Sequence, residues 1–469
     1  MIRIFSQYVS PKSLLLVVLE AALIVLALFC GIRVRFWNNP LEFEFYTQLP
    51  EFAWQGLVFA GIFQICFYYS DLYNLNAIRH RNEQLTSLGQ SLGAGCLLLG
   101  VIYFVFPDLL IGRGVFFIST VLVALFVLLT RLGLDAAWRI AAPAQNILIF
   151  GTGELAVMVA QELKRRGDLN TRLIGFIEPA PVHANFPWTL LGFPVVGAAD
   201  QLEPVTTQQN ISRIVVAMED RRGVLPVRDL VRLRVQGVRV EDAQSTIAAL
   251  SGRVWLRTVR PSWFVFSDGF HRSRLTQVLK RMLDLAFGMA GLVITLPLMA
   301  LIALAVRLDS PGHSIYRQAR VGLKNKPFDV LKFRSMFVNA EQSGEAQWAQ
   351  TNDARVTRVG RFLRKFRLDE LPQFVNVIRG EMSFVGPRPE RPAFVERLRE
   401  EISYYDERHT VRPGLTGWAQ VSYQYGASIE DAFRKLEYDL FYLKNMSIFF
   451  DCAIVLRTIR IVLTGNGGR

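Results

Sequence analysis

Two adjacent carboxylates, Asp369 and Glu370, lie in the densely charged segment RFLRKFRLDELPQ. The cations that precede them there are Arg361, Arg364, Lys365 and Arg367. Positive charge beside a carboxylate keeps it ionised, so that it can act as a nucleophile or a metal ligand, and it attracts polyanionic substrates. We therefore predict that Asp369 and Glu370 are catalytic. The alternative for such a pair is a solvated acidic step at a helix N-terminus, held by the helix dipole.

The cofactor that suits this pair is Mg²⁺. A hard divalent cation of this kind takes one or two carboxylates together with substrate phosphates, and it needs no cage of histidines and cysteines. The chain has only five histidines, and its four cysteines lie far apart without the CxxC spacing of a zinc site. We expect Asp369 and Glu370 to hold Mg²⁺.

Two further arginines stand next to proline and glycine. The segment GPRPERP sets Arg388 in a rigid proline frame, where a guanidinium can be held against a phosphate. In RPGLTGWAQ, Arg412 precedes a turn that contains Gly414 and Gly417. These three residues are plausible nucleotide contacts, and a purely structural turn is an equal alternative.

The composition points to a membrane and to phosphorylated substrates. Of the 469 residues 51% are hydrophobic, and 53 basic residues against 40 acidic ones give a net charge of +13. That surplus would suit nucleic acid, an anionic membrane surface or phosphates equally well. The high apolar content favours membrane and phosphate, so no nucleic-acid partner is expected.

Four stretches in the N-terminal third are apolar over roughly the 20 residues that a bilayer requires. They are residues 13–32, 52–70, 85–106 and 115–130. Basic residues in short loops mark the cytoplasmic side; those on one side of the spans are Arg3, Lys12, Arg79, Arg81, Arg131 and Arg139. We predict a multi-pass bundle with the N-terminus and everything after the fourth span in the cytoplasm.

Polar and small residues within these spans suggest helix contacts. Glu20 is an ionisable group in the first span, which by default suggests a functional site. We interpret it instead as facing a neighbouring helix, hydrogen-bonded or protonated there, because no cation lies within the membrane to pair with it. The run Gly93, Ala94 and Gly95 would support close helix contact, including contact in a homodimer.

The middle third changes to the pattern strand, glycine turn, helix, strand. NILIF is followed by GTGELA, a helical stretch and LIGFI, and the later segments RIVVAM and GVRVE are typical of further parallel strands. We predict a Rossmann-like α/β domain over residues 145–265. Gly151 and Gly153 would let the backbone approach a phosphate. The signal is weak because only GxG is present, so the turn could equally be kept for packing in a domain that binds nothing or binds a regulatory nucleotide.

A fifth apolar segment, residues 284–306, is long enough to span a bilayer. A fifth crossing would place everything after it outside the cytoplasm, where nucleotide sugars are not supplied. Pro297 lies within it and removes a helix hydrogen bond. We therefore predict a re-entrant helix that enters the inner leaflet, breaks near Pro297 and returns to the cytoplasmic side.

At this point a resemblance becomes specific. The motifs KFRSM, LDELPQ, GEMSFVGPRPE and RPGLTGWAQV, in this order after an apolar segment with DSPG and RQARVG, resemble the bacterial sugar transferase family of monotopic polyprenyl-phosphate hexose-1-phosphate transferases. The four spans and the Rossmann-like domain resemble its long members, which initiate exopolysaccharide or O-antigen chains in the bacterial inner membrane. The tail resembles the exosortase-associated exopolysaccharide subgroup.

The resemblance implies a multi-domain membrane protein: a four-helix transmembrane bundle over residues 1–140, the Rossmann-like α/β domain, and an α/β monotopic phosphoglycosyltransferase domain over residues 275–469. It implies that Asp369 attacks the β-phosphate of a UDP-sugar, that UMP leaves, and that undecaprenyl phosphate takes the phosphosugar from the carboxylate. Glu370 would hold Mg²⁺ or position the acceptor. The phosphate-binding cations implied by the motifs are Lys332, Arg334, Arg364, Arg388 and Arg412.

Two positions depart from the family pattern. Leu296 precedes Pro297 where a serine is usual, which puts the hydroxyl support of the helix break in doubt. Arg367 replaces a common serine before the acidic pair, which could change how that loop is tied down.

Two other functions are compatible with parts of the chain. One is a membrane-anchored NAD-dependent nucleotide-sugar epimerase or dehydratase, which requires a TyrxxxLys pair downstream of the glycine turn; the middle third has no tyrosine between Ile147 and Phe270. The other is a non-catalytic scaffold of polysaccharide assembly, which predicts losses in the acidic pair and the phosphate cations. The sequence leaves the hexose open, with glucose favoured by family habit alone.

Overall fold

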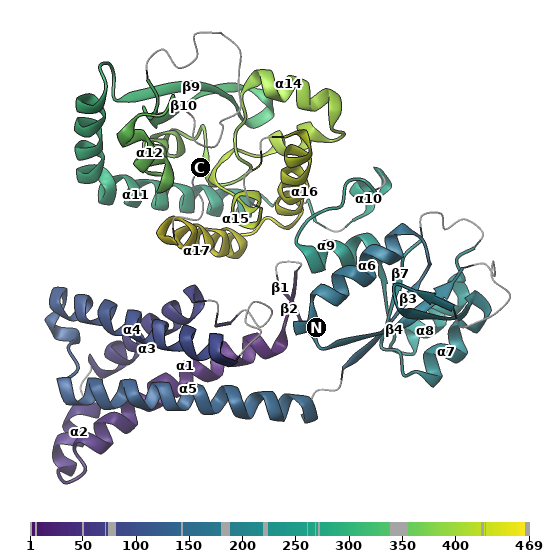
Figure 1. Cartoon of the computed structure of the whole chain (residues 1–469), viewed down its shortest axis with the longest axis horizontal. Coiled ribbons are helices and arrows are strands. Elements are labelled where there is room, and N and C mark those ends of the chain that lie inside the picture. Colours follow the sequence, from purple (N-terminus) through teal and green to yellow (C-terminus); the bar gives the residue numbers. More distant parts are fainter. Residues whose placement is uncertain are drawn as a thin grey trace. The chain divides into compact units, whose positions relative to one another are not determined.

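The protein is seen in a computed structural model (Figure 1), which describes residues 2–4, 7–48, 51–70, 72–73, 81–141, 144–179, 188–218, 224–259, 261–267, 269–270, 273–337, 355–423, 426 and 428–464. Arg79, used above for orientation, lies outside these residues. The chain divides into two compact units, residues 1–246 and 247–469. Residues 247–265, which we assigned to the middle domain, fall in the second unit.

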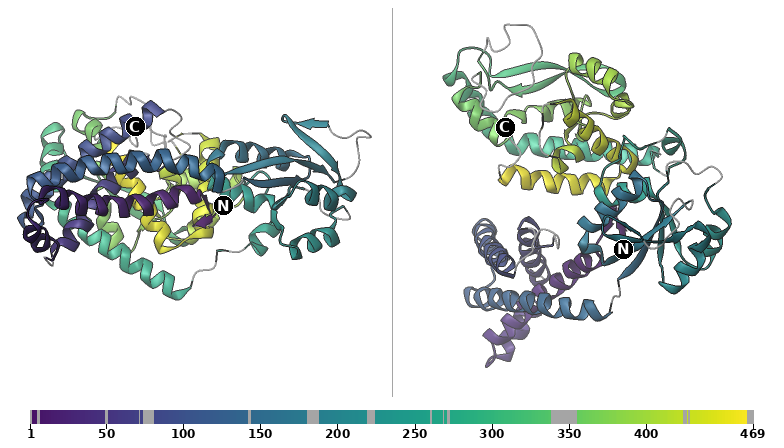
Figure 2. Two further views of the ribbon diagram at one scale, coloured as in Figure 1. Left: turned by 90° about the horizontal axis from the view of Figure 1, so that it is seen from below. Right: turned by 45° about the vertical axis from the view of Figure 1, so that its right-hand side comes forward.

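The first unit begins with a helical bundle. After the small hairpin of β1 (Ile2–Ile4) and β2 (Gln7–Val9) come α1 (Pro11–Arg35), α2 (Pro40–Gln48), α3 (Glu51–Tyr69), α4 (Arg81–Val105), the short η1 (Pro107–Leu109) and α5 (Arg113–Ala141). α1, α3, α4 and α5 are each long and apolar enough to cross a membrane, in agreement with the four predicted spans. α1 runs beside α5 and also packs on α3, which packs on α4 (Figures 1 and 2).

A buried ion pair lies inside this bundle. The carboxylate of Glu20 on α1 is fully buried and lies 2.9 Å from the guanidinium of Arg131 on α5. Arg131 also donates to the carbonyl of Leu72 at 2.9 Å. Glu20 therefore faces a neighbouring helix as predicted, but our reason was wrong, because a cation just past the fourth predicted span reaches it.

The glycines of α4 make one contact within the chain. A Cβ on Gly95 would lie 2.7 Å from the ring of Phe63 on α3, so this glycine allows the two helices to approach. A Cβ on Gly93 would meet nothing within 4 Å. The predicted homodimer stays a prediction.

The α/β domain is a six-stranded sheet in the order β5-β6-β4-β3-β7-β8. Its strands are β3 (Gln145–Phe150), β4 (Thr171–Glu178), β5 (Trp188–Leu190), β6 (Phe193–Ala198), β7 (Arg213–Val216) and β8 (Arg239–Asp242). All neighbours pair in parallel except β5, which forms an antiparallel hairpin with β6. The connecting helices and 3₁₀ turns are α6 (Glu154–Arg165), η2 (Gly167–Leu169), η3 (Ala199–Gln201), α7 (Leu202–Gln208), α8 (Val227–Val235) and α9 (Ala243–Ser251). The parallel doubly wound strands match the prediction, whereas the hairpin was not foreseen.

Packing explains the first glycine of the GxG turn. Gly151 has a φ of +127°, and a Cβ there would lie 2.2 Å from the carbonyl oxygen of Ala217 at the end of β7. Gly153, which directly precedes α6, would meet nothing within 4 Å. The tight turn is thus required by the strand beside it, whether or not a ligand binds.

The second unit contains the charged motifs. In chain order it holds α10 (Pro261–Phe266), α11 (Arg274–Asp309), β9 (Ile315–Val321), η4 (Leu323–Asn325), β10 (Pro327–Phe333), α12 (Arg358–Lys365), η5 (Leu368–Glu370), α13 (Gln373–Arg379), β11 (Ser383–Val385), α14 (Pro392–Glu401), η6 (Tyr405–Thr410), β12 (Gly414–Thr416), α15 (Trp418–Ser422), α16 (Ile429–Asn445) and α17 (Ile448–Thr464). β9 and β10 form an antiparallel ribbon, and β11 pairs in parallel with β12. The main core lies between α14, α16 and α17, around Leu436, Leu440 and Phe450.

α11 is one helix of 36 residues, so it starts ten residues before the predicted segment, and Pro297 lies inside it without ending it. A straight helix of this length would span roughly 54 Å. Both ends nevertheless pack on the same unit: Arg281 near the start contacts α13, and Asp309 at the end accepts from the amide of Val359 in the first turn of α12. Figure 1 shows the helix changing direction along its length. Sharp bends in helices usually lie at proline, and Pro297 is the proline within α11, so we assign the bend to it. The break that we predicted there is a bend within a continuous helix.

Thr295 supports this bend. Its hydroxyl donates to the carbonyl of Gly291 at 2.6 Å, a bond that commonly bends helices. The hydroxyl missing at position 296 is thus present one residue earlier. Around the bend the helix exposes apolar side chains, among them Val293 at 71% and Ile294 at 76%.

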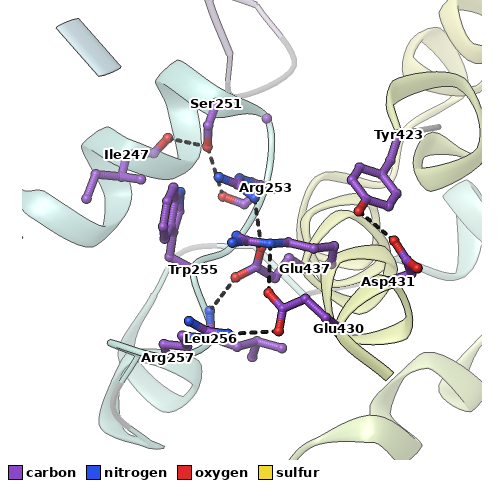
Figure 3. Close-up of polar contacts among 12 residues, drawn as sticks. Ile247, Ser251, Arg253, Trp255, Leu256, Arg257, Tyr423, Glu430, Asp431 and Glu437 are labelled. Atoms are coloured by element: carbon purple, nitrogen blue, oxygen red, sulfur yellow. Dashed lines mark hydrogen bonds and ion pairs between the residues drawn. The ribbon is translucent and has the colours of Figure 1, made fainter. Parts of the chain in front are cut away.

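The strap, residues 252–259, joins α9 to the rest of the second unit and is tied to α16 (Figure 3). The buried carboxylate of Glu437 accepts from Arg253 at 3.2 Å and from the amide of Leu256 at 3.2 Å. The indole of Trp418 donates to the carbonyl of Gly252 at 2.7 Å. The strap is therefore held in place on this unit by side-chain hydrogen bonds.

Candidate active site

The acidic pair lies on a tight turn between two helices. α12 ends at Lys365, and Arg367 adopts the left-handed conformation with φ 55° before the 3₁₀ turn that carries Asp369 and Glu370. Its guanidinium donates to the side chain of Gln420 at 3.1 Å, which ties down the loop in which we noted the missing serine. Both carboxylates are buried, with 8% and 7% of the residue exposed, so the alternative of a solvated acidic step does not apply.

Glu370 is the carboxylate that the cations contact. Its Oε1 lies 3.2 Å from Nζ of Lys332 on β10 and 2.6 Å from Nη2 of Arg388, which follows β11. Burial alone would raise the pKa of Glu370, but the charges of Arg388 and Lys332 outweigh it and hold the pKa well below its usual range. Glu370 is therefore ionised.

Asp369 has a different environment. Among the residues that the structure describes, no hydrogen bond or ion pair involves its side chain, and only burial and more distant charges act on it. Burial and the adjacent charge of Glu370 raise the pKa of Asp369, and Lys332, Arg364 and Arg388 oppose that rise from a distance. The cations that we expected to act on both carboxylates make their direct contacts with Glu370 and oppose the rise in the pKa of Asp369 from a distance. Among the described residues, none competes for the carboxylate of Asp369 through a hydrogen bond or an ion pair.

The other predicted phosphate cations are dispersed. Arg364 on α12 donates to the hydroxyl of Ser335 at 2.9 Å and lies close enough to influence Asp369. Arg412 is engaged elsewhere, donating to the carbonyl of Gly380 at 2.9 Å. Both stay predictions as phosphate ligands.

Arg334 is committed to a structural contact. Its guanidinium is buried and donates to the carbonyls of Val306, Ser310 and Pro311, at 3.3, 2.5 and 3.0 Å. The carbonyls of Ser310 and Pro311 lie beyond the end of α11 and have no partner within the helix, whereas the carbonyl of Val306 also accepts from the amide of Ser310 at 3.2 Å. We therefore remove Arg334 from the predicted phosphate set, since it holds the end of α11.

The glycines after Arg412 serve close packing. A Cβ on Gly414 would lie 2.1 Å from the backbone nitrogen of Gly386, and one on Gly417 would lie 2.1 Å from the carbonyl oxygen of Gly386. Gly386 comes two residues before Arg388. The structural alternative for Gly414 and Gly417 thus has a physical basis, and their contact with a nucleotide stays a prediction.

Two arginines that we did not single out hold the backbone of the GPRPE loop. Arg408 donates to the carbonyl of Arg388 at 2.9 Å, and Arg320 donates to the carbonyl of Pro389 at 3.1 Å. Arg320 lies in the RQARVG motif, which was a usable signal. Arg408 has no motif of its own, and only its buried position reveals it.

The donor set limits how Mg²⁺ could bind. Among the described residues no group of three or more His, Cys, Asp or Glu side chains could hold a metal ion. Asp369 and Glu370 fit the cation only if substrate phosphates supply further oxygens. Because Lys332 and Arg388 already neutralise Glu370, an anionic substrate is needed to make the site attractive to a dication.

Two family models match the chain. The model described as bacterial sugar transferase matches residues 275–465, which include every cation of the site, and a CoA-binding domain model matches residues 69–241. A protein of Aeromonas hydrophila, the UDP-N-acetylgalactosamine-undecaprenyl-phosphate N-acetylgalactosaminephosphotransferase, is 39% identical over 303 residues, 63% of this chain and 67% of that protein. The chain belongs to the bacterial sugar transferase family.

Other members of the family resemble the chain over different lengths. The UDP-glucose:undecaprenyl-phosphate glucose-1-phosphate transferase of Escherichia coli (strain K12) is 46% identical over 189 residues, 40% of each chain. The undecaprenyl-phosphate glucose phosphotransferase of Komagataeibacter xylinus is 32% identical over 333 residues, 68% of this chain and 59% of the relative. In both, the chain covers less than two thirds of the relative. These matches do not favour an epimerase, a dehydratase or a scaffold.

Proposed function

We propose that this protein moves a hexose 1-phosphate from a UDP-sugar to undecaprenyl phosphate and releases UMP. The observation that carries the proposal is the division of labour in the acidic pair. Glu370 is held ionised by Lys332 and Arg388, while Asp369 lies beside it, buried and without a hydrogen-bond partner among the described residues. The names of the family members agree with this transfer.

The transfer proceeds in two displacements at phosphorus. A carboxylate oxygen of Asp369 forms a bond to the β-phosphorus of the UDP-sugar, and the bond from that phosphorus to the bridging oxygen breaks, so that UMP leaves with the electron pair. An oxygen of undecaprenyl phosphate then attacks the same phosphorus, and the bond to Asp369 breaks. The product is the lipid diphosphate sugar, and the carboxylate is regenerated.

The cations stabilise the charge that moves during both displacements. Arg388 and Lys332 meet at Glu370, and a phosphate that enters beside Asp369 comes within reach of the same two groups. Asp369 and Glu370 would hold Mg²⁺ together with phosphate oxygens. The ion, when bound, would neutralise charge on the phosphates and orient them.

The membrane arrangement that we propose is supported by α11. Its bend carries exposed apolar side chains, while both ends pack on the unit that holds Asp369. We propose that α11 dips into the inner leaflet of the bacterial inner membrane and returns, so that the N-terminus and the catalytic unit are both cytoplasmic. The acidic pair then lies near the headgroups, where the phosphate of the acceptor lies. We propose that this transfer is the first membrane step of exopolysaccharide assembly.

The decisive experiment measures nucleotide release. Membranes that contain the protein are incubated with Mg²⁺, undecaprenyl phosphate and a panel that includes UDP-glucose, UDP-galactose and UDP-N-acetylgalactosamine. We expect UMP with one of these sugars and loss of at least about 10³-fold of the rate in Asp369→Asn. Glu396→Gln, an exposed acid of α14, is the matched control and should keep full activity. Release of UDP, or full turnover by Asp369→Asn, would contradict the proposal.

A further inference from the structure

Three charged residues near the start of α11 point back into the catalytic unit. Lys280, Arg281 and Asp284 precede the apolar part of the helix, and by sequence they are only the polar flank of a membrane segment. In the structure Asp284 is buried, with 4% exposed, and the side chain of Lys280 is 13% exposed. Charges that only marked the membrane boundary would face water or headgroups.

Lys280 makes a complete set of contacts. Its ammonium group lies 2.5 Å from a carboxylate oxygen of Asp451 on α17, 2.9 Å from the carbonyl of Val385 on β11, and 3.1 Å from the hydroxyl of Tyr442 on α16. Tyr442 in turn donates to the other oxygen of Asp451 at 2.8 Å. All three hydrogens of the ammonium group have acceptors. One side chain of α11 thus joins three other elements.

Asp284 holds the same strand one helical turn later. Its Oδ1 accepts from the hydroxyl of Ser383 and from the amide of Phe384, both at 2.9 Å. Residues four apart lie on one face of a helix. This face of α11 therefore holds the three consecutive residues of β11, and only Gly386 and Pro387 separate that strand from Arg388.

Arg281 holds the element that follows the acidic pair. Its two terminal nitrogens donate to the carbonyls of Val377 and Ile378 in α13, each at 2.8 Å. Only Leu371 and Pro372 separate Glu370 from this helix. One turn of α11 is thus attached to both segments that carry the ion pair between Glu370 and Arg388.

We infer that Lys280, Arg281 and Asp284 are positioning residues that set the spacing of Glu370 and Arg388, and that this spacing depends on the seating of α11. The inference rests on the proposed function. Catalysis by positioned charges is sensitive to displacements of about 1 Å. The start of the membrane helix is therefore a working part of the active site, although it touches no substrate.

The first test uses isosteric variants in the full-length protein in lipid nanodiscs. Lys280→Met and Asp284→Asn should each lower kcat about 10- to 100-fold, with the KM for the UDP-sugar within about threefold of the parent. Lys280→Arg, which keeps charge and donors, should recover to within about fivefold. Lys326→Met, an exposed lysine of the same unit, is the control and should be unchanged.

The second test separates positioning from general loss of structure. In Lys280→Met combined with Asp451→Asn, where no buried carboxylate loses its cation, hydrogen exchange of the amides in residues 383–390 should become at least about tenfold faster, while the thermal unfolding midpoint stays within a few degrees of the parent. The inference is overturned if Lys280→Met and Asp284→Asn keep activity within twofold, or if exchange at residues 383–390 is unchanged. Exchange needs no substrate. A parent protein that releases no UMP would therefore refute the proposed function and leave this inference to be judged by exchange alone.

Discussion

α1 and α11 are both long apolar helices, but the chain treats them differently. In the most apolar stretch of α1, 39% of the residues are buried within the chain, against 11% in α11. α1 carries its charge in the middle, where Glu20 meets Arg131 of another bundle helix. α11 carries its charges near its two ends and is held at its C-terminal end by Arg334, while no charged residue lies between Asp284 and Arg307. Length and apolarity are shared by both helices. What distinguishes them is where their charged residues find partners: in another helix of the bundle for α1, and in the catalytic unit for α11.

The largest effect is expected from the charge in the middle of α1. Arg131→Ala leaves Glu20 buried without its cation, which should destabilise the bundle by about 3–5 kcal/mol. Denaturant unfolding in detergent measures this, with the exposed Arg113→Ala as control. The double variant Glu20→Gln with Arg131→Gln should recover part of the loss. Equal stability of Arg131→Ala and Arg113→Ala would mean that the pair does not hold α1.

A smaller loss is expected at the end of α11. Arg334→Met leaves the carbonyls of Ser310 and Pro311 without their side-chain donor and that of Val306 with the amide of Ser310 alone, which should cost about 2–3 kcal/mol. The comparison is Arg412→Met, which loses one exposed hydrogen bond and should cost less than about 1 kcal/mol. Proteolysis, used to monitor unfolding of the second unit, measures the stability of both variants. If the two variants are equally stable, α11 is not held at this end.

Glu20 and Arg334 are buried charged groups, and His409 in the second unit is a buried group that is kept neutral instead. Burial and the neighbouring charge of Arg408 lower the pKa of His409 to about 4. Because this folded pKa lies below the unfolded value, the stabilising contribution is full above about pH 6.5 and is lost as the pH falls toward 4. Between pH 7 and 5 the contribution of His409 alone should fall by about 2 kcal/mol, which is read as the difference in pH dependence between the parent and His409→Asn. Thermal unfolding at both values tests this, and His409→Asn should flatten the dependence; an unchanged slope would refute it.

The smallest effect is expected at the bend itself. Thr295→Val removes the hydroxyl that donates to the carbonyl of Gly291 in α11. Thr130→Val removes the equivalent hydrogen bond to the carbonyl of Phe126 in α5, where no proline follows. We expect a decrease in kcat of a few fold, corresponding to about 1 kcal/mol, in Thr295→Val alone, because only there does a proline follow. Identical activity of the two variants would show that Pro297 bends α11 unaided.

Local patterns predicted most of the architecture. The four apolar helices and the parallel strands are signalled by runs of neighbouring residues, and each was found. The pairing of Glu20 with Arg131 joins residues 111 positions apart, and no local pattern announces it. The start of α11 was misplaced because Lys280 and Asp284 look like the polar flank of a membrane segment until their partners on β11 are seen.

The sequence predicted which residue types gather at the site, but it predicted less well what each residue contacts. Lys332 and Arg334 are two positions apart, which would place both on one face of a strand. β10 ends at Phe333, however, so Lys332 reaches Glu370 while Arg334 turns toward α11. Spacing likewise could not say which of two adjacent carboxylates the cations contact, since that depends on where Arg388 arrives from another strand.

The strap between α9 and α11 bears on how such a chain could be shortened or fused. A catalytic unit that began at α11 would lack Arg253 and the amide of Leu256, leaving Arg434 of α16 beside the buried carboxylate of Glu437. The indole of Trp418 would lose its acceptor as well. Transplanting this unit onto a different N-terminal partner therefore means carrying residues 252–259 along, or replacing Glu437 and Trp418 together.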